Sequence, residues 1–232
     1  MIPLNIDSKT LYLLEDLRKD FTISFEVKNI NYCEVFIKNK TAIVYYNPKI
    51  VDTEAITHEL LHIWFNRFNC NLGNCIFLST RSNVKLSGIL TKFLCDHIAN
   101  CCEHYKMYPK YIEMGYQPSK FMMNSLAPKA SLQDLKEINL SFLWRYNSSA
   151  INMFIGCLIS ILADHVHNDY TKHHLILERK NRRLYKIITD FWQRWLDFDV
   201  NNIESTFNWR SELTDDLINE LGIWSKSKRL IN

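Results

Sequence analysis

The residues best suited to chemistry are His58, Glu59 and His62, in the stretch 54-EAITHELLHIWF-65. On a helix, residues four apart project from one face about one turn apart, so both imidazoles could bind one metal ion. Zinc suits neutral imidazole ligands and takes tetrahedral sites. Glu59 directly follows His58, so its carboxylate could accept a proton from a water molecule that the metal activates. The spacing therefore predicts a zinc site with Glu59 as general base.

The residues around this pentapeptide distinguish a metal site from a chance match. Polar side chains form one stripe of the predicted helix, made of His58, Glu59, His62 and Asn66. The rest of the circumference is apolar, with Ile56, Leu60, Leu61, Ile63, Trp64, Phe65 and Phe68. A buried carboxylate without a partner is costly, so the stripe must face a metal, a cavity or a paired charge. The alternative is a core helix whose two histidines make ordinary hydrogen bonds.

A catalytic zinc site normally has three protein ligands and a water molecule. The best source of a third ligand is 95-CDHIANCCEHYKMYP-109, in which Asp96, Asn100, Glu103, His104 and Met107 share one helical face, with His97 at its margin. We favour His104 or Glu103 as the ligand and keep Asp96 and His97 as alternatives. The residues that do not bind would orient the imidazoles. The simpler alternative is that this polar face is exposed to solvent.

These residues depend on a small set of predicted elements. We expect a helix over residues 8–20, capped by Ser8, a strand over 22–29 and a hairpin over 31–47 that turns near Lys38–Lys40. Asp52 is a good N-cap for a helix over 53–68. Beyond it we expect only helices, over about 84–108 (ending near Pro109), 110–115, 132–145, 148–167, 171–198 and 210–222. The fold class is therefore α+β, with a small N-terminal antiparallel sheet followed by a mostly helical body.

Residues 22–109 resemble the zincin metallopeptidases, because a strand-rich region ending 41-TAIVYYNPKI-50 precedes a capped helix that carries HELLH. More loosely, this region is similar to the small bacterial metallopeptidases that cleave phage repressors. The resemblance implies a zincin-like core over residues 1–125, with a helical region over 126–232 packed on it. It also implies that residues 41–47 form a sheet edge that holds an extended polypeptide substrate, and that the next helix supplies the third ligand, which is acidic in the bacterial enzymes. Phe65 and Phe68 exclude the metzincin pattern, and the thermolysin-type Asn-Glu signature is missing.

Composition narrows the possible compartments and partners. The net charge is only +3, so we expect no nucleic-acid partner, and the basic run 172–186 is typical of a solvated helix face. The seven cysteines are odd in number and include no Cys-x-x-Cys, which favours free thiols and a cytoplasmic location. The N-terminus lacks the apolar segment of a signal peptide. The apolar run 150–163 is too short to span a membrane and reads as a core helix.

The sequence therefore predicts a zinc-dependent metallopeptidase, with His58, His62 and a third residue as ligands, Glu59 as general base and a polypeptide as substrate. One alternative is a catalytically inactive, zincin-like module that binds a protein partner through its helical half. Another is a metal-stabilised fold in which a fourth protein ligand closes the site. A separate polar group, His165, Asp169 and His173, lies in 164-DHVHNDYTKHH-174. We interpret it as a polar junction between helices. The alternative is that it lines the substrate cleft. Oligomeric state is left open.

Overall fold

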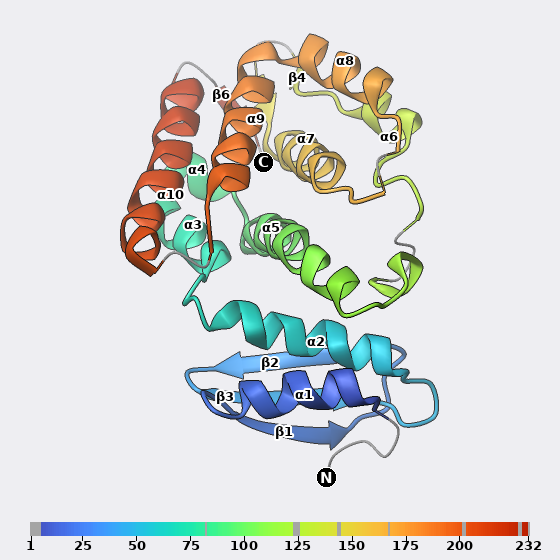
Figure 1. The fold of residues 1–232 in the computed structure, drawn as a ribbon. Coiled ribbons are helices and arrows are strands. Elements are labelled where there is room, and N and C mark those ends of the chain that lie inside the picture. The colour runs from blue at the N-terminus through green and yellow to red at the C-terminus, as the bar shows by residue number, and fades with distance from the viewer. Residues whose placement is uncertain are drawn as a thin grey trace. The chain divides into compact units, whose positions relative to one another are not determined.

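The computed structural model describes residues 6–81, 83–122, 126–142, 145–166, 168–200, 203–226 and 229–231 (Figure 1). It confirms the α+β class, with a small N-terminal sheet followed by a mostly helical body. The chain forms two compact units: the first is Met1–Cys70 with Lys106–Ala127, and the second is Asn71–Tyr105 with Pro128–Asn232. The domain boundary predicted after residue 125 directly follows residues 123–125, which lie outside the described residues.

The first unit contains a mixed sheet. Strands β1 (Thr22–Val27), β2 (Glu34–Lys38) and β3 (Thr41–Tyr46) are arranged in the order β1-β3-β2. The predicted hairpin is confirmed, since β2 and β3 pair antiparallel through a two-residue turn that starts at Asn39, whose φ is +55°. The predicted sheet was wholly antiparallel, but β1 pairs parallel to β3. The hairpin therefore adds to β1 through its second strand.

The strand order β1-β3-β2 contradicts one implication of the zincin resemblance. Residues 41–47 were expected at a sheet edge, but β3 lies in the centre, with β1 on one side and β2 on the other. Its backbone groups are already engaged in both ladders, so it has no open side for a polypeptide. The two edges of this sheet, within the described residues, are β1 and β2.

Two helices complete the core of the first unit. Helix α1 (Ser8–Leu17) begins at Asp7, not Ser8, because the Asp7 carboxylate accepts a hydrogen bond from the Thr10 N–H at 2.8 Å. Helix α2 (Thr53–Asn66) begins at Asp52 as predicted, and Asp52 accepts from the Ala55 N–H at 2.8 Å. A carboxylate at this position satisfies an orphan N–H and suits the positive end of the helix dipole.

The second unit is mostly helical. Its helices include α3 (Leu72–Thr80), α4 (Val84–Ile89), the N-terminal part of α5 (Lys92–Glu113), α6 (Leu132–Glu137), α7 (Ser148–Leu162), α8 (Thr171–Lys180), α9 (Arg182–Asp197) and α10 (Ile203–Lys226). The apolar run 150–163 is indeed a core helix: α7 buries Ile151, Phe154, Ile155 and Leu158 completely.

Several predicted boundaries in the helical region were wrong. Helix α3 was not predicted; it begins at Asn71, whose side chain accepts a hydrogen bond from the Asn74 N–H. The helix predicted over 84–108 is divided into α4 and α5, and α5 continues through Pro109 to Glu113. The helix predicted over 171–198 is divided at Asn181, which caps α9.

A second small sheet was not predicted, because only helices were expected beyond residue 84. Strands β4 (Ser141–Phe142), β5 (Arg145–Asn147) and β6 (Arg229–Ile231) form it in the order β4-β5-β6. Strand β5 pairs antiparallel with β4 and parallel with β6, which follows it by more than eighty residues. Short strands of this kind carry little local signal in the sequence. A short 3-10 helix, Pro118–Lys120, belongs to the first unit.

Candidate metal centre

Helix α2 positions three of the predicted site residues. Its apolar side chains are buried, and Leu60, Leu61 and Ile63 are completely inaccessible to solvent. The buried face holds the helix firmly against the rest of the first unit, which restricts the directions in which its polar side chains can point. Glu59 shares this burial, with only 9% of its surface exposed, and His62 is half-buried.

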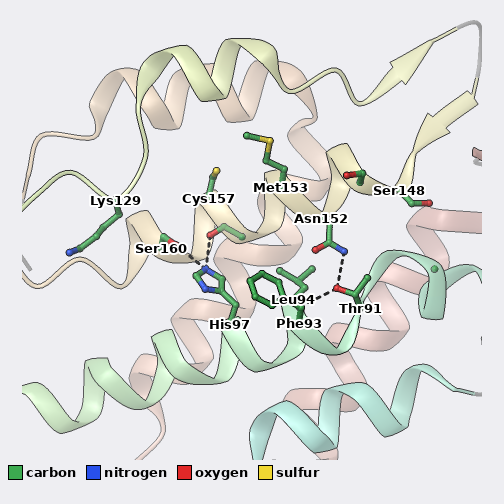
Figure 2. A pocket seen from close by; sticks show the side chains of 13 residues that line it. Thr91, Phe93, Leu94, His97, Lys129, Ser148, Asn152, Met153, Cys157 and Ser160 are labelled. Atoms are coloured by element: carbon green, nitrogen blue, oxygen red, sulfur yellow. Dashed lines mark hydrogen bonds between the residues drawn. The ribbon is translucent and has the colours of Figure 1, made fainter. Parts of the chain in front are cut away.

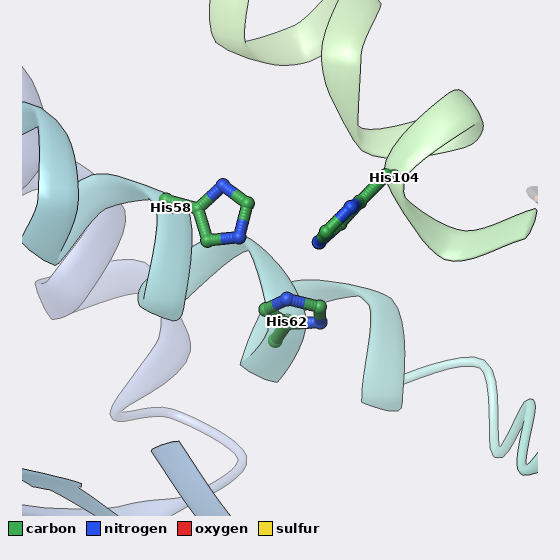
Figure 3. A group of neighbouring side chains, drawn as sticks. All are labelled: His58, His62 and His104. Atoms are coloured by element: carbon green, nitrogen blue, oxygen red, sulfur yellow. The ribbon is translucent and has the colours of Figure 1, made fainter. Parts of the chain in front are cut away.

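Three imidazoles form a group that could hold one metal ion. His58, His62 and His104 each offer a nitrogen, and these nitrogens all lie within 4.8 Å of one another. Figure 3 shows the three rings turned toward a common point. His104 lies on the continuous helix α5, just before Lys106, at which this helix enters the first unit. His104 is itself 9% exposed.

The other candidate ligands lie elsewhere. Among the described residues, the group does not include Glu103, the neighbour of His104. Asp96 is exposed and forms an ion pair with Lys92, one turn earlier on α5. His97 points to α7, where its Nε2 lies 2.9 Å from the Ser160 hydroxyl and 3.3 Å from the Gly156 carbonyl oxygen.

The surroundings of His58 favour its neutral form. Burial, and secondarily the nearby His62, lower the pKa of His58 to about 3, although a hydrogen bond with the Phe121 backbone acts in the opposite direction. The Phe121 ring packs against the imidazole, with the two ring centroids 4.8 Å apart. A neutral imidazole is the form that binds a metal ion, so these surroundings fit a ligand role.

The pKa of Glu59 lies near neutral pH. Burial raises its pKa to about 7, and it prevails over two opposing effects, the charge of His62 and a hydrogen bond from the Val35 backbone N–H. Val35 lies on β2, an edge of the sheet. Its N–H therefore points away from β3 and toward α2. This contact holds the carboxyl group in a defined position.

A cavity of about 370 Å³ opens beside His58 and Glu59 within the first unit. Its other lining residues come from three segments: Asn31–Cys33, Ile50–Asp52 with Ala55, and Ser119–Met122. An ion pair of 3.0 Å joins Lys120 to Asp52, so the end of the 3-10 helix is tied to the start of α2. The cavity gives the carboxyl group of Glu59 access to a ligand of moderate size.

The donor set of the three histidines fits zinc. Imidazole nitrogen is a borderline ligand that suits zinc, and three protein ligands leave one tetrahedral position for water or substrate. The carboxyl group of Glu59, which is not in the group of three histidines, directly follows His58 in the sequence. Calcium and magnesium prefer oxygen ligands, so this group of nitrogens does not suit them.

Sequence reasoning missed two residues of the site, Val35 and Phe121. Both contact the HELLH segment from parts of the chain far from it in sequence, so no local pattern indicates them. The other histidine group does not converge. His173 bonds to the Ala130 carbonyl at 3.1 Å, His165 stacks on Tyr105, and exposed Asp169 accepts from the Thr171 N–H.

No protein-family model, curated protein or solved structure matches this chain. All seven cysteines are free thiols. Among the described helices, none has both the length and the apolar character needed to cross a membrane.

Proposed function

We propose that the protein is a zinc-dependent metallopeptidase, in which His58, His62 and His104 hold the metal and Glu59 is the general base. The observation that carries this proposal is the convergence of three buried or half-buried imidazoles beside a buried carboxyl group. A buried ionisable group is costly to maintain, so the gathering of His58, His104 and Glu59, with half-buried His62 beside them, supports a functional site.

A zinc ion bound here would supply Lewis-acid chemistry, lowering the pKa of water and polarising an amide carbonyl. The task of Glu59 is to take a proton at its carboxylate oxygen and return it to the leaving amine. A base serves this purpose best when its pKa lies near the working pH, and burial raises the pKa of Glu59 to about 7. The Val35 N–H orients the carboxyl group, so the proton is accepted at a defined position.

The open edge of β2 supports a polypeptide as substrate. An extended chain can add to a free sheet edge through main-chain hydrogen bonds. Glu59 lies beside this edge, because it accepts a hydrogen bond from the Val35 N–H, so a substrate strand would pair with the other outward backbone groups of β2. Large apolar side chains are exposed around it, with Tyr32 56%, Phe36 54% and Ile50 54% accessible. Tyr32 and Ile50 also line the cavity beside Glu59, so apolar surface is available next to the base for the side chains of a substrate. This edge takes the place of residues 41–47, whose central position excludes that role.

Metal content and cleavage test the proposal together. We expect the purified protein to retain one equivalent of zinc after dialysis, measured by plasma mass spectrometry. His58→Ala and His104→Ala should lose it, whereas Glu103→Gln and His97→Ala should keep it. Glu59→Gln should keep zinc but reduce cleavage of a peptide library by about 10²-fold or more, since proton transfer contributes that much to typical hydrolases.

Each result has a distinct meaning. Equal zinc in the wild type and in His58→Ala would refute the metal site. Full activity in a zinc-loaded Glu59→Gln variant would refute the role of the base. Stoichiometric zinc without cleavage of any peptide would favour the alternatives, an inactive interaction module or a metal that only stabilises the fold.

A further inference from the structure

A second cavity, of about 740 Å³, lies within the second unit between the first turns of α5 and one face of α7 (Figure 2). Its size falls within the range of about 300–1,000 Å³ that is typical of small-molecule sites. The lining residues are Gly88, Thr91, Phe93, Leu94, His97, Lys129, Ser148, Ser149, Asn152, Met153, Gly156, Cys157 and Ser160. The proposed metal centre uses none of them.

Hydrogen-bonding groups are held in fixed positions inside this cavity. The His97 Nε2 lies 2.9 Å from the Ser160 Oγ, so the imidazole and the hydroxyl group orient each other. The Asn152 amide nitrogen donates to the Ile89 carbonyl and lies 3.4 Å from the Thr91 hydroxyl. Its carbonyl oxygen is therefore left on the side of the cavity, facing the direction of His97 in Figure 2. A ligand with one hydroxyl or amide group would find both a donor and acceptors here.

Apolar side chains from both helices border the same space. Phe93 on α5 is 83% exposed and Met153 on α7 is 43% exposed, whereas Leu94 between them is buried. An exposed phenyl ring and a thioether on opposite walls suit an aromatic ligand, since sulfur and aromatic edges attract one another and rings stack. Gly156 leaves space between α7 and α5, because a Cβ at this position would occupy it, 3.7 Å from Leu94 and 3.8 Å from the His97 ring.

The charges argue against an ionic ligand. Lys129 is the one charged residue among those that line the cavity, and no carboxylate lines it. The Lys129 ammonium lies 4.0 Å from the buried carboxylate of Asp164, so the pair has no net charge. A charged ligand would lose its hydration in this cavity without gaining an opposite charge.

We propose that this cavity binds an uncharged aromatic small molecule that carries one hydrogen-bonding group. The aromatic body would lie between Phe93 and Met153, and the polar group would reach Ser160, His97 or the Asn152 carbonyl. This inference goes beyond the proposed hydrolase and does not depend on bound metal.

Two fluorescent probes with the same ring system test the proposal. N-phenyl-1-naphthylamine is uncharged and carries one N–H, and 1-anilinonaphthalene-8-sulfonate is its anionic counterpart. We expect saturable binding of the uncharged probe at one molecule per chain, in the presence of EDTA, and at least 10-fold weaker binding of the sulfonate. Phe93→Ala should weaken binding of the uncharged probe about 5-fold or more. Gly156→Ala should also weaken it, because the added methyl group narrows the cavity at ordinary contact distances.

The controls make the outcome decisive. Val84 is 86% exposed and lies outside the cavity, so Val84→Ala should leave binding unchanged. Because Phe93 is itself highly exposed, its loss leaves the folded core intact. Unchanged binding in Phe93→Ala, or equal binding of the two probes, would overturn the proposal. Because the measurement is made without metal, its failure would leave the hydrolase proposal untouched, and the reverse also holds.

Discussion

The pKa values of His58 and Glu59 are shifted in opposite directions, which predicts how the free energy of unfolding of the metal-free protein depends on pH. Burial lowers the pKa of His58 from 6.5 to about 3, so between these values the unfolded chain binds a proton that the folded chain does not. Unfolding is then favoured as the pH falls. Burial raises the pKa of Glu59 from 4.5 to about 7, so the folded chain holds an extra proton between these values. Folding is then favoured as the pH falls.

Between pH 4.5 and 6.5 the two effects offset each other. Each group alone would change the free energy of unfolding by about 1.4 kcal/mol per pH unit. Glu59→Gln removes one of them and leaves the other, because Glu59 is not among the groups that shift the pKa of His58. From pH 6.0 to pH 5.0 the variant should therefore lose about 1 kcal/mol relative to the wild type, because only the wild type keeps the opposing effect of Glu59, whose carboxyl group over this range is protonated in the folded chain and almost wholly ionised in the unfolded chain.

Urea unfolding of EDTA-treated protein, followed by tryptophan fluorescence at pH 5.0, 5.5 and 6.0, measures this difference. At a slope of about 2–3 kcal/mol per molar urea, the midpoint of Glu59→Gln should fall by about 0.5 M more than that of the wild type. Glu26→Gln makes the same chemical change at an exposed position of β1 and should follow the wild type. Parallel curves for Glu59→Gln and the wild type would refute the assigned burial effects.

Two further predictions concern hydrogen bonds in the two units. Tyr116→Phe should lower the free energy of unfolding by about 2 kcal/mol, because the Tyr116 hydroxyl bonds to buried Thr10 at 2.7 Å, and Tyr12→Phe, at an exposed site, should have no effect in the same urea assay. Trp195→Phe should cost about 2–3 kcal/mol by thermal unfolding, because Trp195 is fully buried and its indole N–H donates to the Cys102 carbonyl at 3.0 Å.

These two predictions would be contradicted by different results. Equal losses in Tyr116→Phe and Tyr12→Phe would show that the buried hydroxyl contributes nothing. A midpoint unchanged in Trp195→Phe would show that neither the indole volume nor its N–H stabilises the second unit.

Local signals were enough to predict the elements that carry the site. Asp52 as a cap, the apolar periodicity after it and the turn near Asn39 each act over a few residues, and the structure confirms α2 and the β2–β3 hairpin. The helix predicted to end near Pro109 continues past it, because packing outweighs the local tendency of proline to end a helix. Met107 and Tyr111 on either side of it are completely buried, and their burial offsets the cost of a proline inside α5.

The candidate site was only partly accessible from sequence. His58, Glu59 and His62 share one short segment, so helical geometry alone places them together. The choice between Glu103 and His104 depends on which side of α5 turns toward α2, and neighbouring residues on a helix point in directions about 100° apart. Strand pairing had the same difficulty: the pattern of 22–29 predicts a strand, but whether it joins the hairpin parallel or antiparallel depends on contacts remote in sequence.

The short turn at Asn39 has a consequence for how this chain can vary over evolution. Backbone N–H groups alternate in direction along a strand, so the register that pairs Val35 with Val44 also decides which N–H reaches Glu59. An inserted residue that moved the pairing of β2 by one position would turn the Val35 N–H toward β3 and leave the carboxyl group without its donor. Surface hairpins usually tolerate changes in length, but here the length of the turn sets the register that directs the Val35 N–H to Glu59. Natural variants should therefore differ in the side chains of this turn and keep its number of residues.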